Sequence, residues 1–306
     1  MFALQFSRFG GPDVLGVGSL DEPHAGPGEI RIAVRATGVA PADTMLRAGQ
    51  LRPDLGFPHV PGVDAAGVVD EVGVAVDGVA VGDEVFGAVD VLRLGGAAAE
   101  FAVLQFWARK PEVWSWAEAG GAATSVETAT RALDALGVTE GMTLLVEGAA
   151  GGVGSTAVQL AIARGARVIG TSSEKNRDAL AALGVTTTTY GPGLSQRVAE
   201  LAPEGVGVAL DVAGAGSLED LVAITGDPTR VVTIADFSAA EHGIRLSYSG
   251  SGDPDGRYGL AVAAALATEG RFRVVVRQVF PLERGADAHA SAAAGHGTGK
   301  VVLTVP

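Results

Sequence analysis

The apolar and polar positions of this 306-residue chain follow two patterns, one in the first hundred residues and another after residue 117. In the first region apolar residues alternate with polar ones in short runs, and Pro and Gly separate the runs. Alternation of this kind is typical of half-buried strands. It predicts strands over residues 29–35, 63–72, 83–86 and 100–104, with one helix near 41–48.

After residue 117 short apolar runs alternate with stretches of helical periodicity, which predicts a parallel sheet covered by helices. Helices are expected near 175–183 and 217–224, and strands over 206–212 and 230–235. The tail predicts helices over 258–269 and 282–294 and strands over 273–280 and 300–305. Residues 249–257 are polar and rich in Gly, which makes them the best linker candidate.

A strand, a glycine-rich turn, a helix and a second strand follow one another between residues 143 and 177. Within the turn, Ala149, Gly151 and Gly154 match the G-x-G-x-x-G spacing of dinucleotide-binding folds, with Ala in the first place. The middle Gly lets backbone amides approach a pyrophosphate, and the helix N-terminus attracts the phosphates. A bare turn is the alternative, since the chain holds 45 glycines. The predicted cofactor contacts of the turn are Ala149, Gly151, Gly152, Val153 and Gly154.

The residues after the second strand bear on the choice between NAD and NADP. Folds that prefer NAD usually carry an acid there, which accepts from the ribose 2′-OH. This chain instead offers hydroxyls and cations at Thr171, Ser172, Ser173, Lys175 and Arg177. Because Lys and Arg make charge-assisted bonds to phosphate, these residues favour NADPH. Glu174 speaks against NADPH unless it complements the helix dipole, and a solvated helix face is the alternative for the two cations.

Composition excludes several classes of protein. Hydrophobic residues make up 47% of the chain and charged residues 19%, so it can bury a sizeable core, and its length predicts about two domains. The net charge of −13 argues against nucleic-acid and anionic-membrane partners. The absence of cysteine excludes disulfides, thiol catalysis and thiolate metal ligands. No signal or membrane-spanning pattern is visible, so we expect a cytoplasmic protein.

Several motifs occur in the order found in one large family of oxidoreductases. They are Pro27-Gly28-Glu29-Ile30, Pro41-Ala42-Asp43, Pro61-Gly62-Val63-Asp64-Ala65-Ala66-Gly67, Gly82-Asp83-Glu84-Val85, Glu127-Thr128-Ala129-Thr130-Arg131-Ala132-Leu133, the dinucleotide turn, and Gly299-Lys300-Val301-Val302-Leu303. With this set the chain resembles the medium-chain dehydrogenase/reductase superfamily over nearly its whole length. Within that superfamily it resembles the zinc-free quinone oxidoreductase branch, which is zeta-crystallin-like.

The resemblance implies an α/β architecture of two domains with an active site in the cleft between them. A GroES-like, mostly β domain would span residues 1–118 and be completed by 258–306. A Rossmann domain with a doubly wound parallel sheet would span 119–257, bind NADPH and pair in a homodimer. By position Thr128 would bond the nicotinamide carboxamide, and Arg177 and Tyr190 would contact the 2′-phosphate. An ordinary aromatic at a strand end is the alternative for Tyr190.

Zinc-dependent members of this superfamily carry an early Cys, a His-Glu pair and a four-Cys loop. Here Val63 and Asp64 stand at the His-Glu position, and the chain has no Cys. The histidines, which are His24, His59, His242, His289 and His296, show no ligand spacing. The sequence therefore predicts no metal.

The chain departs from the quinone oxidoreductases at the residues expected to face the substrate. Ala40 stands in place of Asn, and the apolar Met45 and Leu51 replace Tyr residues. On spacing alone Met45 and Leu51 belong to the core; the resemblance places them in the substrate pocket. Asp43 could orient the ribose or a proton network, and with Thr128 it is the candidate catalytic residue. A turn-capping role without chemistry is the alternative for Asp43.

The leading prediction is an NADPH-dependent reductase of a quinone or an activated C=C bond in a small-molecule substrate, with the proton taken from water. A 2-enoyl thioester reductase is one alternative, although it would need a basic patch and no basic cluster is visible beyond the NADPH site. A non-catalytic NADPH-binding sensor or structural homologue is the other alternative, because polar residues are missing at positions 40, 45 and 51.

Overall fold

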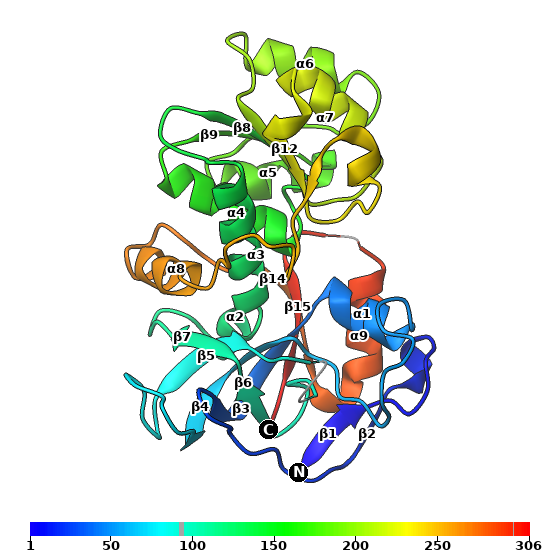
Figure 1. Cartoon of the computed structure of the whole chain (residues 1–306), viewed down its shortest axis with the longest axis vertical. Helices are drawn as coiled ribbons and strands as arrows, with labels where there is room; N and C mark the ends of the chain where they lie inside the picture. Colours follow the sequence, from blue (N-terminus) through cyan, green and yellow to red (C-terminus); the bar gives the residue numbers. More distant parts are fainter. Residues whose placement is uncertain (92–94, 296) are drawn as a thin grey trace. The chain divides into compact units, whose positions relative to one another are not determined.

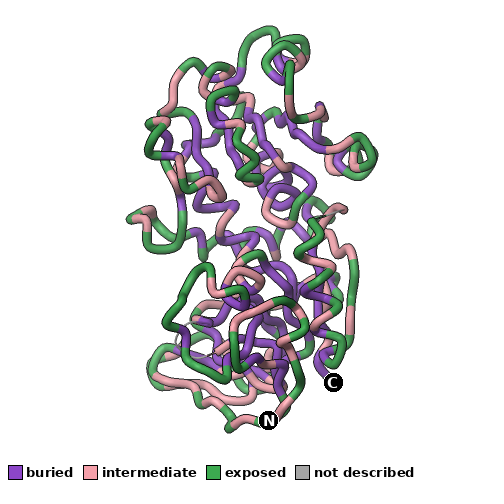
Figure 2. The backbone as a smooth tube through the Cα atoms, turned by 90° about the vertical axis from the view of Figure 1, so that its right-hand side faces the viewer, coloured by how far each residue is buried: buried purple, intermediate pink, exposed green. Residues whose placement is uncertain are grey.

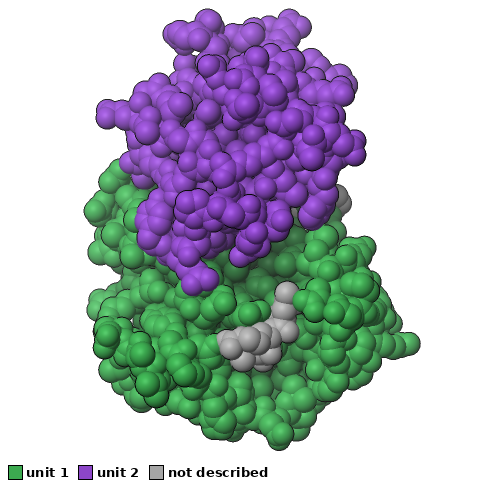
Figure 3. Space-filling view, in the orientation of Figure 1, with its two compact units in different colours: residues 1–124, 260–296, 300–306 green, residues 125–259, 297–299 purple. Residues whose placement is uncertain are grey.

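The computed structural model describes residues 1–91, 95–295 and 297–306. The chain divides into two compact units (Figure 3), the first made of residues 1–124, 260–296 and 300–306 and the second of 125–259 and 297–299. The chain thus leaves the first unit after residue 124 and returns after 259, where the sequence predicts 118 and 257. Residues 297–299 also belong to the second unit, and the sequence did not predict this.

The first unit is mostly β (Figure 1). Its described residues form a sheet in the order β14-β15-β3-β4-β5-β7, with β6 beside β3 and a separate β1–β2 pair. The strands are β1 (Phe2–Gln5), β2 (Gly16–Ser19), β3 (Ile30–Val39), β4 (Asp64–Val72), β5 (Glu84–Ala88), β6 (Phe101–Leu104), β7 (Phe106–Arg109), β14 (Val276–Pro281) and β15 (Lys300–Thr304). The helices are α1 (Pro41–Arg47), α2 (Trp116–Gly120), α8 (Gly259–Thr268), whose first residue belongs to the second unit, and α9 (Gly285–Ala293).

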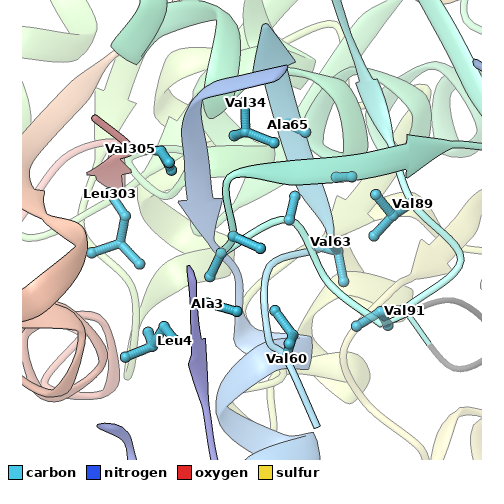
Figure 4. Packing of buried hydrophobic residues seen from close by; sticks show 14 of the residues in the cluster. Ala3, Leu4, Val34, Val60, Val63, Ala65, Val89, Val91, Leu303 and Val305 are labelled. Carbon is cyan, nitrogen blue, oxygen red and sulfur yellow. The ribbon is translucent and has the colours of Figure 1, made fainter. Parts of the chain in front are cut away.

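The core of the first unit explains the alternation seen in the sequence. The first residues of β3 alternate between buried and partly exposed, whereas its last four are all buried. At that end β3 pairs with β15 and contacts α2. The contact with α2 is close, since a Cβ on Gly120 would lie 2.7 Å from Ala36. Side chains from β1, β3, β4 and β15 gather in the hydrophobic cluster of Figure 4.

The second unit contains a parallel sheet in the order β10-β9-β8-β11-β12-β13 among the described residues. Its strands are β8 (Thr143–Glu147), β9 (Arg167–Thr171), β10 (Thr186–Thr188), β11 (Val208–Asp211), β12 (Val231–Thr233) and β13 (Arg245–Leu246). Its helices are α3 (Ala123–Ala135), which begins in the first unit, α4 (Gly152–Ala163), α5 (Arg177–Ala181), α6 (Leu194–Leu201) and α7 (Leu218–Thr225). This is the 3-2-1-4-5-6 order of a Rossmann fold, and it confirms the predicted fold class.

Continuous apolar runs mark the central strands of this sheet, because helices cover both faces of a parallel sheet. All residues of β11 and all but the first of β8 are buried, and the buried stretches of chain are visible in Figure 2. The sequence missed β10 and β13, which are short and at the two edges. It also predicted one helix over 175–183, where the structure has a 3-10 turn at Glu174–Asn176 followed by the short α5.

Candidate dinucleotide and substrate sites

The glycine-rich turn links β8 to α4, and two of its backbone N–H groups donate hydrogen bonds to Thr171 of the neighbouring strand. The N–H of Gly148 donates to Thr171 Oγ1 at 3.1 Å, and the N–H of Ala149 donates to the Thr171 carbonyl at 3.0 Å. Gly151 is the N-cap of α4 and has no side chain to occupy the first-turn amides. A helix start of this kind leaves N–H groups and a positive dipole end for an anion, so the turn fits the pyrophosphate of a dinucleotide.

The two glycines of the fingerprint meet different surroundings. A Cβ on Gly154 would lie 2.2 Å from the Gly148 carbonyl oxygen and 2.8 Å from Ala149 Cα, so no side chain fits there. A Cβ on Gly151 would meet nothing closer than 3.6 Å. Gly154 is therefore required for the packing of α4 on the turn, whereas Gly151 leaves open space next to the backbone. Open space is what a pyrophosphate needs for its close approach.

Two of the predicted cofactor residues at the end of β9 face the protein interior. Thr171 is fully buried and its hydroxyl accepts from Gly148, so it supports the turn. Ser172 is 6% exposed, and its Oγ donates to the Ser173 carbonyl at 3.1 Å. Both hydroxyls have protein partners in this structure, so a direct contact of either with a 2′-phosphate stays a prediction.

The other predicted 2′-phosphate residues are exposed at the carboxyl ends of two neighbouring strands. Lys175 and Arg177 are exposed and have no ion-pair partner among the described residues. Because β10 pairs with β9 in register, Tyr190, which is 58% exposed, follows the adjacent strand end. Arg197 holds the segment that carries Tyr190, with bonds of 2.9 Å to the Thr189 carbonyl and 2.8 Å to that of Pro192.

Sequence reasoning missed two carboxyl groups at the point where the strand order reverses. Glu147 ends β8, Asp211 ends β11, and the two are in register on these adjacent strands. Asp211 accepts from Ala213 N–H at 2.9 Å and from Thr233 Oγ1 at 2.7 Å, whereas Glu147 accepts from Ser217 Oγ. Burial, together with the nearby negative charges of Asp211 and Asp220, raises the pKa of Glu147 to about 7. The signal in the sequence that could have revealed both residues is an acidic residue directly after an apolar run.

Thr128 lies on α3 within a hydrogen-bond network of its own helix. Its Oγ1 donates to Glu127 Oε2 at 3.2 Å and lies 3.4 Å from Arg131 Nη2. The side chain is half-buried, in contrast to the buried Glu127 and Arg131. Of this group the sequence singled out only Thr128 as a site residue.

In the first unit Asp43 is fully buried on α1. Its Oδ2 accepts from Ala40 N–H and its Oδ1 from Gly62 N–H, both at 2.7 Å. Burial raises the pKa of Asp43 to about 6. This geometry favours the capping alternative over direct chemistry, because both oxygens are already occupied by backbone donors. Nearby, Met45 is half-buried and Leu51 is 39% exposed.

At the position where zinc-dependent relatives carry His-Glu, Asp64 is paired with a cation of the chain. Lys300 Nζ lies 2.8 Å from Asp64 Oδ2, and Thr124 N–H donates to Oδ1 at 2.6 Å. The described residues contain no group of three or more His, Cys, Asp or Glu side chains suited to a metal ion; His296 lies outside them. Over the same residues, every helix is too short or too polar to cross a membrane.

Two family models match the chain, and relatives match it over almost its whole length. The alcohol dehydrogenase GroES-like domain matches residues 26–133, and the zinc-binding dehydrogenase family matches 183–303. A 2-methylene-furan-3-one reductase of Solanum lycopersicum is 30% identical over 99% of this chain and 79% of its own length. A chloroplastic quinone-oxidoreductase homolog of Spinacia oleracea is 31% identical over 99% of this chain and 98% of its own. The chain belongs to the medium-chain dehydrogenase/reductase superfamily. Membership supports an oxidoreductase that binds a nicotinamide cofactor.

Two further proteins are similar to most or all of the chain. A solved structure named NAD-dependent alcohol dehydrogenase covers all of the chain with a TM-score of 0.86 and 31% identity. The pikromycin polyketide synthase component PikAII of Streptomyces venezuelae is 35% identical over 92% of this chain, which spans 8% of that synthase. The chain is thus similar to one segment of that much longer synthase.

Proposed function

We propose that this protein is a zinc-independent, NADPH-dependent reductase that transfers a hydride to a quinone or to the activated C=C bond of an enone. The observation that carries the proposal is the glycine turn at the start of α4, followed by the exposed Lys175 and Arg177. Relatives named quinone oxidoreductase and alkenal/one oxidoreductase support the substrate class.

Different residues would bind the different parts of the dinucleotide. The amides of Gly152, Val153 and Gly154 would hold the pyrophosphate, with Ala149 and Gly151 leaving room for it. Lys175, Arg177 and Tyr190 would bind the 2′-phosphate. Thr128 would bond the carboxamide of the nicotinamide ring, which supplies the hydride. A Ser173 hydroxyl contact completes the proposed set.

Zinc independence rests on the residues that stand in the relatives' metal position. The carboxylate of Asp64 is already neutralised by Lys300, and a cation in that position leaves no charge for a metal to balance. Asp43 is fully buried and each of its oxygens accepts from a backbone N–H, so we propose that water protonates the reduced product. Met45 and Leu51 would line the substrate pocket as apolar surfaces.

An enoyl thioester reductase is the second candidate, and the match to PikAII favours it. The two candidates share the cofactor and the hydride transfer, and they differ in the acceptor, which is a quinone or an enone in the first and the C=C bond of a thioester in the second. Thioesters on coenzyme A carry phosphates, and the chain's net charge of −13 disfavours such substrates unless arginines converge locally.

We also propose a homodimer that pairs through the Rossmann sheet. Strand β13 lies at the edge of that sheet and pairs only with β12 among the described residues, so in the proposed dimer a second copy would pair at this edge. Light scattering coupled to size exclusion tests this directly: a mass of one chain would contradict it. A cytoplasmic location is a prediction of the sequence alone.

The test begins with binding of NADPH and NADH to the purified protein, compared with the variant Arg177→Ala. One charge-assisted bond is worth about 1.5–3 kcal/mol, so NADPH should bind roughly 10- to 150-fold tighter than NADH. R177A should remove most of that preference, while Arg271→Ala, on an exposed ion pair of the first unit, should keep it. Equal or tighter NADH binding would contradict the assignment of residues 172–177.

Turnover then separates the candidate functions. Loss of reduced-cofactor absorbance is followed with quinones, enones and crotonyl-coenzyme A. Turnover of quinones or enones supports the leading proposal, whereas preferential turnover of the thioester supports the second candidate. Tight NADPH binding without turnover of any acceptor would identify a non-catalytic NADPH-binding protein.

A further inference from the structure

A buried polar network in the second unit joins α3 to the segment after β13, and Arg131 is its centre. Arg131 is 4% exposed, and its Nε lies 2.9 Å from Glu127 Oε1. Its Nη1 donates to Ser247 Oγ at 2.7 Å, which connects two positions 116 residues apart. An unpaired N–H donor of a buried guanidinium would be energetically unfavourable, so these hydrogen bonds fix the position of Arg131 and of its partners.

The segment from β13 to residue 256 makes polar contacts within itself as well as with α3. Asp253, whose side chain is 2% exposed, accepts from Ser247 Oγ at 2.7 Å and forms an ion pair with Arg245. Further along, Gly256 N–H donates to Glu127 Oε1 at 3.2 Å. The loop is therefore attached to α3 at both ends, through Arg131 at Ser247 and through Glu127 at Gly256.

The backbone of this segment packs so closely against α3 that no side chain fits at the two glycines of the contact. A Cβ on Gly256 would lie 2.1 Å from the Glu127 carbonyl oxygen, and one on Gly259 would lie 2.0 Å from Thr130 Oγ1. The backbone of residues 256–259 thus lies directly on the helix. The position of the segment is set by backbone contact, and the buried charges of Glu127 and Arg131 hold it there.

The same network determines which way the hydroxyl proton of Thr128 points. Its Oγ1 faces Arg131 Nη2 at 3.4 Å and Glu127 Oε2 at 3.2 Å. A guanidinium can only donate and a carboxylate can only accept, so the Thr128 proton points to Glu127 and one of its lone pairs faces Arg131. The remaining lone pair is available to an N–H donor, such as the amide of a nicotinamide carboxamide.

We propose that Arg131, held in place by Glu127 and Ser247, is a positioning residue for the nicotinamide end of the cofactor and acts through Thr128. The inference rests on the proposed dinucleotide function. It adds a residue that sets the geometry of one half of the ligand, while the other half is bound at the glycine turn and at the strand ends of β9 and β10. Substitutions at Arg131 should therefore weaken the binding of the nicotinamide half and leave the binding of the adenosine half unchanged.

The test compares two ligands that share the adenosine half. NADPH and adenosine 2′,5′-bisphosphate both carry the 2′-phosphate, but only NADPH reaches Thr128. Dissociation constants are measured for the wild type, Arg131→Met and Arg131→Lys. We expect NADPH to bind at least about tenfold more weakly to R131M while the bisphosphate changes less than about threefold. R131K should fall between, because Lys keeps the charge but loses the planar fork of donors.

Matched variants separate positioning from general loss of structure. Arg164→Met removes another arginine of the same unit, whose ion pair with Asp134 spans 2.8 Å, and should leave both constants unchanged. Ser247→Ala removes the hydrogen bonds of Ser247 to Arg131 and to Asp253, and it should reproduce part of the NADPH effect because Arg131 loses one of its partners. It also serves as the deciding variant if R131M does not fold. In a double-mutant cycle the effects of R131M and Thr128→Ala on NADPH should be less than additive.

The outcomes are distinct. Equal weakening of both ligands by R131M and R131K would overturn the inference, because it would show a purely structural role. Unchanged binding of NADPH in R131M, R131K and S247A would overturn it as well. Failure of the wild-type protein to bind either ligand would instead overturn the proposed function, on which the inference depends.

Discussion

Lys300 and Asp64, 236 residues apart, form a buried ion pair with 2.8 Å between Nζ and Oδ2. The Asp64 side chain is fully buried and that of Lys300 is 8% exposed. Lys300 begins β15 and Asp64 begins β4, and both strands pair with β3, so the pair joins two neighbours of the same central strand. Removing one partner would leave an uncompensated charge in the core of the first unit.

We therefore expect Lys300→Met to lower the free energy of unfolding by about 3–5 kcal/mol. Urea denaturation measures this. The double variant K300M with Asp64→Asn keeps an acceptor for Thr124 N–H without the charge, and it should recover much of the loss. Arg271→Met, at a pair in which both side chains are 55% exposed, should change stability by less than about 1 kcal/mol. A double variant as unstable as K300M would contradict this account.

The two fingerprint glycines should respond differently to alanine. Gly154→Ala places a Cβ 2.2 Å from a carbonyl oxygen, so it should lower stability by about 1–3 kcal/mol or more and abolish cofactor binding. Gly151→Ala meets nothing closer than 3.6 Å, so thermal unfolding should stay near that of the wild type while NADPH binds more weakly. If G151A binds NADPH normally, the pyrophosphate does not approach this backbone.

Glu147 should make stability depend on pH. Its pKa of about 7 in the folded protein lies above the unfolded value of about 4.3, so folding takes up a proton between these limits. The free energy of unfolding therefore falls as pH rises from about 4.5 to about 7, and this contribution is level outside that window. Glu147→Gln cannot lose a proton, so its stability relative to wild type should rise by about 2–4 kcal/mol across the window.

Denaturation at several pH values measures this difference. Glu204→Gln, at a side chain that is 83% exposed, serves as the control and should follow the wild-type profile. A constant difference between E147Q and wild type from pH 4.5 to 8 would show that folding does not raise the pKa of Glu147.

Asp43→Asn separates chemistry from capping. The substitution replaces one acceptor by an amide donor next to a backbone N–H, so stability should fall by about 1–3 kcal/mol. If Asp43 only caps the turn, turnover per folded molecule and NADPH affinity should stay close to wild type at low temperature. Full stability with lost turnover would identify Asp43 as catalytic and would contradict protonation by water. Asp54→Asn, on an exposed pair with Arg52, is the control.

Local chemistry explains which features could be predicted from the sequence. The glycine turn was recognisable because its spacing and the apolar runs on either side lie within about thirty-five residues. The parallel sheet covered by helices followed from the alternation of strands and helices, whereas the order of its strands did not. In contrast, the edge strand β10 consists of three threonines, which form no apolar run, and was missed.

The buried polar pairs could not be predicted because they depend on strand order and on long connections. Glu147 and Asp211 become neighbours only when β11 is placed beside β8. Arg131 meets Ser247 across 116 residues, and a single sequence contains no signal for that pairing. The same limit applied to Thr171, whose burial depends on the turn it supports.

The place of β15 in its sheet has a consequence for synthesis on the ribosome. This strand lies between β14 and β3, and all but the last of its residues are buried. Residues 125–259 are made before it, so the Rossmann sheet can fold while the other sheet still lacks an interior strand. Until residue 304 has left the exit tunnel, residues 36–39 of β3 lack the strand that pairs with them, and nascent chains could expose these residues to one another. Chaperone binding during translation is most useful in that interval.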